Sequence, residues 1–184
     1  MTHWLLTVTT YGTWLPGDPR GSVTSVRDLR RGEKRTPGRH EHSQFDTPFE
    51  QPLIGLRRCA QTRLKGPPVR LRREHADALV TQFLETSEHR WWSISAIAVM
   101  WNHFHIVLAA PREVSREKIR RDFKAYASRK RNELFPKPAS NEWWTAGGSC
   151  RPLNSDLAVA NAVNYVLFKQ FAPLVIWQPD CSGR

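Results

Sequence analysis

Two histidines one residue apart give the strongest chemical signal in the sequence. His103 and His105 flank Phe104 at the start of an apolar run that continues to Ala109. Alternate residues of a β-strand project from the same face, so both imidazoles are expected to point one way and Phe104 the other. Two imidazoles on one face can chelate a divalent cation. The pattern therefore predicts a metal site on one face of a strand and an apolar core on the other.

A pair of histidines is not a complete catalytic metal site, because a third ligand and open positions for substrate are also needed. Imidazole suits zinc and the later transition metals, whereas Mg²⁺ and Mn²⁺ favour oxygen ligands. The residue types alone therefore leave the metal open. A second pair with the same spacing, His40 and His42, lies in a charged segment around Glu41 that has no strand pattern. We expect no metal site there.

The residues around the histidine pair predict the elements that position it. Strands are expected over residues 3–9, 91–101, 103–109, 143–145 and 174–177, and helices over 73–88, 115–134 and 156–171. Asn102 is a suitable turn residue between two of these strands. Within 91–101 the alternation predicts one shared face for Ile94, Ala96, Ala98 and Met100.

The order of these elements is the βαββαβ order of a ferredoxin-like domain. This α+β fold is an antiparallel sheet with helices on one face, here followed by one more helix at the C-terminal end. We expect the other face to be open to nucleic acid or to a partner. The chain is expected to be a single domain over 1–184, with a long basic, loop-rich insertion over 11–70 and the main core over 71–176.

The charge of the chain predicts a polyanionic partner. Lys and Arg total 28 against 17 Asp and Glu, which gives a formal net charge of +11. Nucleic acid is the first candidate and an anionic membrane surface is the rival. No apolar stretch is long enough to span a bilayer, and the N-terminus does not resemble a secretory signal. Three widely spaced cysteines suggest neither a disulfide framework nor a zinc site, so we expect a cytoplasmic protein.

Basic residues recur along the expected helix 115–134. Arg116, Arg120 and Lys124 are spaced by four, and Arg129 and Lys130 follow them. Because few acidic residues are interleaved, contact with phosphates is favoured over plain solvation.

Aromatic residues leave more than one interpretation open. Stacking on unpaired bases, core packing and a dimer interface are all compatible with four of the eight tryptophans: Trp91, Trp92, Trp143 and Trp144. The chain has three tyrosines, any of which carries a hydroxyl that can act as a nucleophile. Tyr11 lies among turn residues and is expected to be structural. Tyr126 continues an apolar helical stripe, so core packing is expected for it, whereas Tyr165 lies in the last helix.

Two segments resemble a known family. The run Asn102-His103-Phe104-His105-Ile106-Val107-Leu108 resembles the HUH motif of the single-tyrosine transposases, which include the REP-associated tyrosine transposases of bacteria. The run from Asn164 to Gln170 resembles the helix that carries the nucleophilic tyrosine in that family. The segment from Trp143 to Leu153 is similar to the segment that precedes this helix in the family. The resemblance covers about residues 71–171 and the first strand.

The resemblance implies an enzyme that nicks and transfers single-stranded DNA. Tyr165 would be the nucleophile that forms a 5′-phosphotyrosine, and His103 and His105 would hold a divalent metal ion, for which we expect Mg²⁺ or Mn²⁺. Tyr126 is the alternative nucleophile. Where the family often has Gln or Asn one turn after the tyrosine, this chain has Lys169, so Gln170 is the weaker candidate for a third ligand. Lys169 then joins the residues expected to contact DNA.

The family also implies hairpin-forming single-stranded DNA as substrate and a homodimer as the assembly. One alternative is a DNA-binding protein that descends from such a transposase and is catalytically weakened, as Lys169 would suggest. Another is a structural or regulatory metal-binding protein, which predicts metal binding without DNA affinity. The net charge of +11 argues against that last class.

Overall fold

The computed structural model describes residues 1–20 and 53–180. They belong to two compact units, one built from residues 1–13 and 65–184 and a second from residues 14–64. The pair His40 and His42 lies outside the described residues. The limits of the second unit fall inside the insertion expected over 11–70, and the division of the chain into one domain with an insertion stays a prediction.

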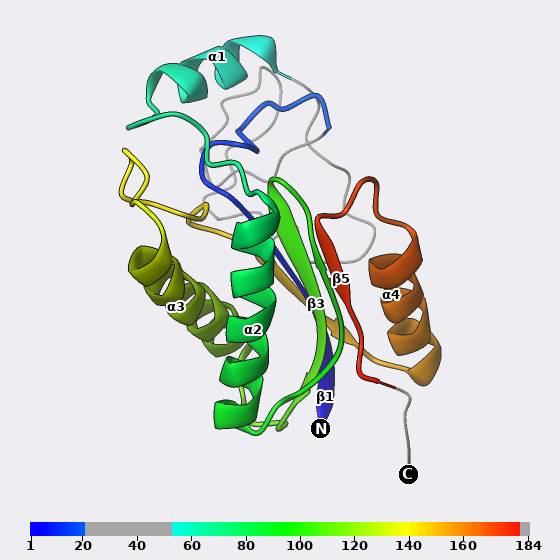
Figure 1. Cartoon of the computed structure of the whole chain (residues 1–184). Coiled ribbons are helices and arrows are strands. Elements are labelled where there is room, and N and C mark those ends of the chain that lie inside the picture. Colours follow the sequence, from blue (N-terminus) through cyan, green and yellow to red (C-terminus); the bar gives the residue numbers. More distant parts are fainter. Residues whose placement is uncertain (21–52, 181–184) are drawn as a thin grey trace. The chain divides into compact units, whose positions relative to one another are not determined.

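A five-stranded antiparallel sheet forms the centre of the larger unit (Figure 1), with the strand order β4-β1-β3-β2-β5. The strands are β1 (Thr2–Thr9), β2 (Ser93–Val99), β3 (His103–Ala110), β4 (Ser149–Leu153) and β5 (Val175–Trp177). The first four follow the ferredoxin-like βαββαβ order, and β5 adds an edge strand beside β2. The predicted α+β fold class is therefore confirmed.

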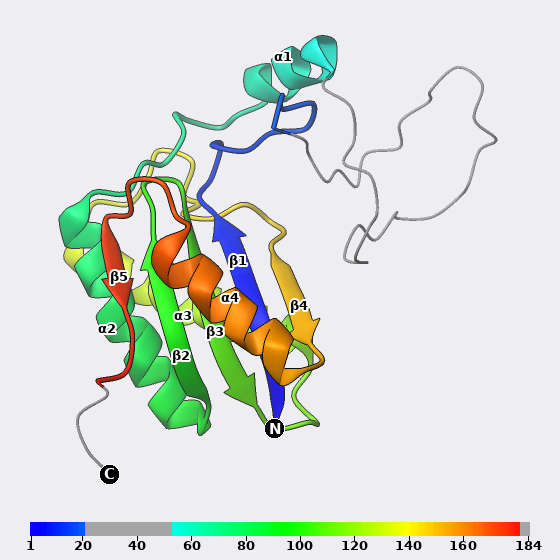
Figure 2. The same ribbon diagram turned by 90° about the vertical axis from the view of Figure 1, so that its right-hand side faces the viewer.

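Helices cover both faces of this sheet, as Figure 2 shows. The helices α2 (Arg73–Arg90) and α3 (Arg116–Leu134) pack together on one face, and α4 (Asp156–Phe168) packs on the other. The expectation of an open second face is wrong. Buried Ala162, Val166 and Leu167 of α4 form a second apolar cluster with the sheet, so this face is closed by the helix that carries Tyr165.

The alternation of side chains along β3 divides these two cores. Phe104, Ile106 and Leu108 pack in the cluster shared with α2 and α3, whereas Val107 packs under α4. In β2 a register shift between Ile94 and Ala96 breaks the alternation. A bulge adds one residue to a strand and reverses the side-chain parity beyond it. The predicted shared face is therefore wrong for Ile94, which packs on the α2–α3 side, and right for Ala96, Ala98 and Met100, which pack under α4.

Some elements differ from those expected. The strand expected over 143–145 is instead one bridge between Thr10 and Trp144, and the edge strand β4 begins at Ser149. Helix α1 (Ile54–Thr62), in the smaller unit, lies where only loop was expected. The last helix ends at Phe168 rather than at residue 171, because the chain turns at the cap residue Lys169.

The tryptophans separate into two classes. Trp92, Trp143 and Trp144 are buried in the larger core, whereas Trp91 is 84% exposed. The indole N–H of Trp143 donates to Asn132 Oδ1 at 2.8 Å, and that of Trp144 donates to Ser128 Oγ at 3.0 Å. Core packing is thus the outcome for three of the four, and α3 satisfies the indole N–H groups of Trp143 and Trp144.

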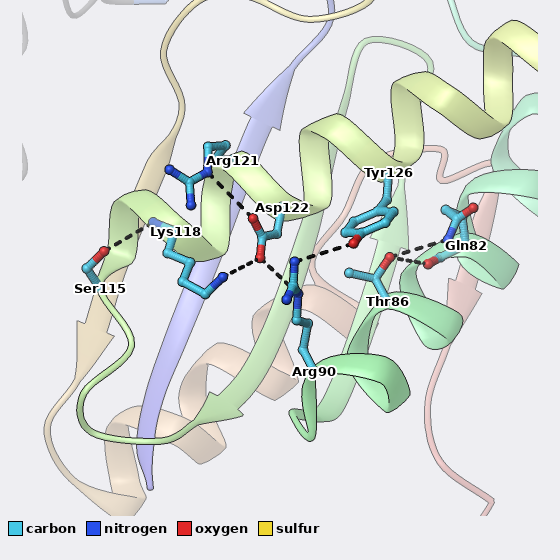
Figure 3. Close-up of polar contacts among 8 residues, drawn as sticks. All are labelled: Gln82, Thr86, Arg90, Ser115, Lys118, Arg121, Asp122 and Tyr126. Atoms are coloured by element: carbon cyan, nitrogen blue, oxygen red, sulfur yellow. Dashed lines mark hydrogen bonds and ion pairs between the residues drawn. The ribbon is translucent and has the colours of Figure 1, made fainter.

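A buried carboxylate ties α2 to α3 (Figure 3). Asp122 of α3 forms ion pairs with Arg90 of α2 at 3.0 Å and with Lys118 at 3.0 Å, and lies 3.6 Å from Arg121. Arg90 also donates to the hydroxyl of Tyr126 at 3.3 Å. These contacts hold the two helices together on the face of the sheet opposite α4. In the described part of the chain, no helix is both long and apolar enough to cross a membrane.

Candidate active site

The two predicted histidines lie at the start of β3, on the face that α4 covers. Their ring centroids are 4.9 Å apart, and the rings are nearly perpendicular at 82°. His105 is only 5% exposed. Burial, aided by the charge of His103, lowers the pKa of His105 to about 3. The ring is therefore neutral near pH 7, which is the form that ligates metals.

Each imidazole is held through its Nδ1 atom. His103 Nδ1 lies 2.6 Å from Oδ1 of Asn102, and His105 Nδ1 lies 2.7 Å from Oγ1 of Thr7. Thr7 is the register partner of His105 across the β1–β3 pair, so the two side chains emerge on the same face. The other ring nitrogen of His105, Nε2, is buried and has no hydrogen-bond partner among the described residues. A cation is one group that can satisfy this atom.

Tyr165 is carried to the histidines by α4. Its ring centroid lies 5.4 Å from that of His105, at an interplanar angle of 67°. The helix begins at Ser155, whose hydroxyl accepts from the Ala158 N–H at 3.1 Å, and its buried stripe fixes which face meets the sheet. Tyr165 is nevertheless 42% exposed. The structure thus brings Tyr165, His103 and His105 together at a place that solvent, and hence a substrate, can reach.

The end of α4 positions the two residues that follow the tyrosine. Lys169 is the exposed cap residue, and its N–H donates to the carbonyl of Tyr165 at 3.1 Å. The side-chain amide of Gln170 donates to the same carbonyl at 2.9 Å. Among the residues that the structure describes, no group of three or more His, Cys, Asp and Glu could hold a metal ion. The nitrogen donors here are the two imidazoles.

Tyr126 lies away from these groups. It is on α3, which covers the opposite face of the sheet, and it is half-buried between the Arg90 hydrogen bond and the guanidinium of Arg129, 5.4 Å from its ring centre. The sheet therefore separates Tyr126 from His103 and His105.

Two of the predicted DNA-binding cations bond to the chain itself. The ammonium of Lys124 donates to the carbonyls of residues 145–147 at 2.5, 3.1 and 3.2 Å, and Arg120 donates to the Gly148 carbonyl at 3.0 Å. Burial and the nearby charge of Arg120 lower the pKa of Lys124 to about 8. These cations hold the segment before β4. A spacing of four could not reveal this, because it marks a helix face without saying what covers it.

The other predicted cations are differently placed. Arg116 pairs with neighbouring Glu117 at 2.8 Å, near the start of α3. Arg129 is exposed and lies over the Tyr126 ring, and Lys130 is half-buried on the same helix. Sequence reasoning gave Thr7 no role, because its contact with His105 follows only from the strand register.

Comparison with known proteins gives the family of this chain. Residues 68–166 match the family described as "Transposase IS200 like". The chain belongs to this family. The matched span is more than half of the chain and contains both histidines and Tyr165. The resemblance to single-tyrosine transposases is thereby confirmed.

The solved structures that resemble this IS200-like chain include one titled "Structure of the REP associates tyrosine transposase bound to a REP hairpin". The two chains share 12% sequence identity with a TM-score of 0.46, and the match covers 90% of this chain. The present chain spans 64% of the length of that one. No curated protein matches the sequence.

Proposed function

We propose that this transposase cleaves and rejoins single-stranded DNA through Tyr165, with His103 and His105 holding a divalent cation, Mg²⁺ or Mn²⁺. One observation carries the proposal. The Tyr165 ring lies 5.4 Å from the His105 ring, which in turn lies 4.9 Å from the His103 ring, all on one face of the sheet. A nucleophile beside a pair of imidazoles is the arrangement that metal-assisted transesterification requires.

In the proposed reaction the hydroxyl oxygen of Tyr165 attacks the scissile phosphorus. A bond forms between phosphorus and the tyrosine oxygen while the bond to the 3′ oxygen breaks. The phenol gives up its proton to solvent, and the departing oxygen takes a proton from solvent and leaves as a 3′-OH. The DNA 5′ end stays linked to Tyr165. Attack by a 3′-OH reverses the sequence and rejoins a strand, so no nucleotide cofactor is consumed. A bound divalent cation would supply the Lewis acid that polarises the phosphate.

The surroundings of Tyr165 support a nucleic-acid substrate. The side chain is 42% exposed, so a phosphate can approach it, and the exposed Lys169 follows one turn later. We propose that Lys169 contacts a phosphate near the nucleophile. Gln170 is the candidate third ligand through Oε1, because its amide nitrogen donates to the helix end and cannot bind a cation. We expect the substrate to be hairpin-forming single-stranded DNA.

The five cations of α3 are proposed to act at a distance from Tyr165, because α3 lies on the other face of the sheet. Of these, Arg116, Arg129 and Lys130 are the proposed phosphate contacts, whereas Arg120 and Lys124 are expected to act by shaping the 145–148 segment that they hold. Substitution of Arg116, Arg129 or Lys130 should therefore cause a larger loss of DNA affinity at low salt than at high salt.

We propose that the chain acts as a homodimer. Three exposed apolar side chains lie on α4 and just after it, namely Leu157, Phe168 and Phe171, and a fourth, Ile176, lies on the edge strand β5. Exposed apolar side chains that gather in one region are typical of protein contact surfaces. Light scattering of the protein as it elutes from a size-exclusion column should give twice the mass of one chain. In Phe168→Ser the measured mass should fall to that of one chain. A single-chain mass for the unmodified protein would contradict the proposal.

Covalent capture tests the proposed chemistry. The protein is incubated with a labelled library of single-stranded hairpins and Mg²⁺ or Mn²⁺, and adducts are resolved under denaturing conditions. We expect an adduct that Tyr165→Phe abolishes and that Tyr126→Phe retains, since Tyr126 lies on the other face of the sheet. An adduct lost only in Tyr126→Phe would overturn the choice of nucleophile. Tight binding across the library without any adduct would favour the catalytically weakened DNA-binding protein.

A further inference from the structure

We infer that Thr7 and Asn102 are positioning residues that fix both imidazoles in the tautomer with hydrogen on Nδ1, so that each Nε2 offers its lone pair to the cation. This inference rests on the proposed function, because it assumes that the histidine pair is a metal site. A residue that acts on a ligand in this way sets both its orientation and its protonation, and such partners contribute strongly to metal affinity.

The contact at His103 fixes the direction of the hydrogen bond. Oδ1 of Asn102 is an acceptor only, so the proton between it and His103 Nδ1, 2.6 Å away, belongs to the ring. A neutral imidazole that carries hydrogen on Nδ1 has its lone pair on Nε2. Asn102 is 4% exposed, so no bulk water competes for this bond.

The backbone of Asn102 is itself held by the segment that follows β1. Its carbonyl accepts from the Thr10 N–H at 2.8 Å, from the Thr10 hydroxyl at 3.1 Å and from the Thr13 hydroxyl at 3.3 Å. The turn before β3 is closed by a bond from the Met100 N–H to the His103 carbonyl at 2.8 Å. The acceptor that orients His103 therefore has little freedom to move.

The contact at His105 involves a hydroxyl, which can donate or accept. If Thr7 donated to Nδ1, the hydrogen of the neutral ring would lie on Nε2, a buried atom without a partner among the described residues. That would leave a buried donor unsatisfied and turn it towards the cation. If Thr7 accepts from Nδ1, Nε2 presents a lone pair instead. The second arrangement matches that of His103 and is the one that a metal site requires.

Nuclear magnetic resonance of the metal-free, full-length protein tests the tautomers directly. The ¹⁵N shifts of a histidine ring distinguish a protonated from an unprotonated nitrogen. We expect Nδ1 of both rings to be protonated and Nε2 unprotonated near pH 7. Thr7→Val, which keeps the shape of the side chain and removes the hydroxyl, should mix the tautomers of His105, and Thr7→Ser should restore the single form. A protonated Nε2 on His105 in the unmodified protein would overturn the inference.

Metal affinity gives the second readout. The affinity for Mn²⁺ can be measured from the electron paramagnetic resonance signal of the free ion. It should fall about 10- to 100-fold in Thr7→Val and recover in Thr7→Ser. Thr86→Val is the matched control, because buried Thr86 lies on α2, on the opposite face of the sheet, and loses a bond to the Gln82 carbonyl rather than to an imidazole. It should bind Mn²⁺ as the unmodified protein does. Equal affinity in Thr7→Val and Thr86→Val would overturn the role of Thr7.

The two readouts separate this inference from the proposed chemistry, because neither uses DNA. Expected tautomers and Mn²⁺ affinities without a covalent adduct would support the roles of Thr7 and Asn102 while contradicting strand cleavage. An adduct that Tyr165→Phe abolishes, formed by a protein whose His105 carries its proton on Nε2, would support cleavage and overturn the inference. Melting curves of each variant confirm that the fold is retained.

Discussion

Replacement of Lys124 by methionine separates the cost of burying its ammonium from the benefit of its hydrogen bonds. Lys124 donates to three successive carbonyls, those of residues 145–147. The last two acceptors are exposed, so water can replace the lost donor there, and the part-buried Thr145 carbonyl carries most of the loss. A hydrogen bond to a charged donor contributes about 1.5–3 kcal/mol. Methionine also removes the burial penalty, so we expect a net loss of about 1 kcal/mol near pH 7.

The pH dependence of stability shows whether the charge of Lys124 stabilises or destabilises the folded chain. Burial, with the charge of Arg120, lowers the pKa of Lys124 to about 8 in the folded chain. An unfolded lysine has a pKa of about 10.4, so between these values the unfolded state binds more protons than the folded state. The contribution of Lys124 to the free energy of unfolding therefore increases as the pH rises through the window from about 8 to about 10.4. Lys124→Met lacks the gain, so the substitution should cost more at the top of the window than near pH 7.

Urea unfolding at a series of pH values measures this difference, with tryptophan fluorescence as the signal. The matched control is Lys130→Met, another half-buried lysine of α3, which has no carbonyl partner among the described residues. The control should lie within about 0.5 kcal/mol of the unmodified protein, as is usual for surface substitutions. A cost for Lys124→Met that shrinks as the pH rises would refute the reasoning, since it would mean that the folded chain favours the ammonium.

Three further predictions concern stability and reactivity. Gly148, at φ +143°, would place a Cβ 3.2 Å from the Thr7 carbonyl, so Gly148→Ala should lower the free energy of unfolding by about 1–3 kcal/mol, whereas Gly147→Ala, with open space around it, should have little effect in the same urea titrations. Asp122→Asn removes the charge that faces three cations in a buried site and should cost about 3 kcal/mol, and an unchanged urea midpoint would contradict the α2–α3 clamp. Burial raises the pKa of Cys150 to about 12, so a thiol reagent at pH 8 should label exposed Cys59 well before Cys150, which should react only on unfolding.

The sequence predicted the faces of β3 because that strand has an unbroken alternation. Phe104 and His105 fall on opposite faces as expected. The same reasoning failed at Ile94, since a bulge reverses parity and nothing in the local pattern marks it. It also failed at β4, an edge strand in which only Cys150 and Leu153 are buried. Trp143 and Trp144 look more strand-like but pack into the core from a loop.

The residues of the candidate site differ in how far the sequence alone could predict them. The histidine pair followed from spacing on a strand, whereas Tyr165 followed from the family resemblance, because a helix that is apolar almost all round does not single out one aromatic. Thr7 lies 98 positions before His105 in the chain. Its contact depends on the register of two strands, which is set by the packing of the whole sheet and not by either strand alone.

The position of α4 is what joins these separate facts into one site. Val107, on the same face as His105, belongs to the cluster that receives Val166, the residue after Tyr165. Because the apolar stripe of α4 binds this face, the adjacent position on the helix brings the phenol against His105 and leaves it partly exposed. The packing of α4 on this face of the sheet, which the sequence pattern did not predict, is therefore the physical step that places a tyrosine beside two imidazoles. A substitution such as Val166→Asp should therefore separate Tyr165 from His103 and His105 without changing any of these three side chains.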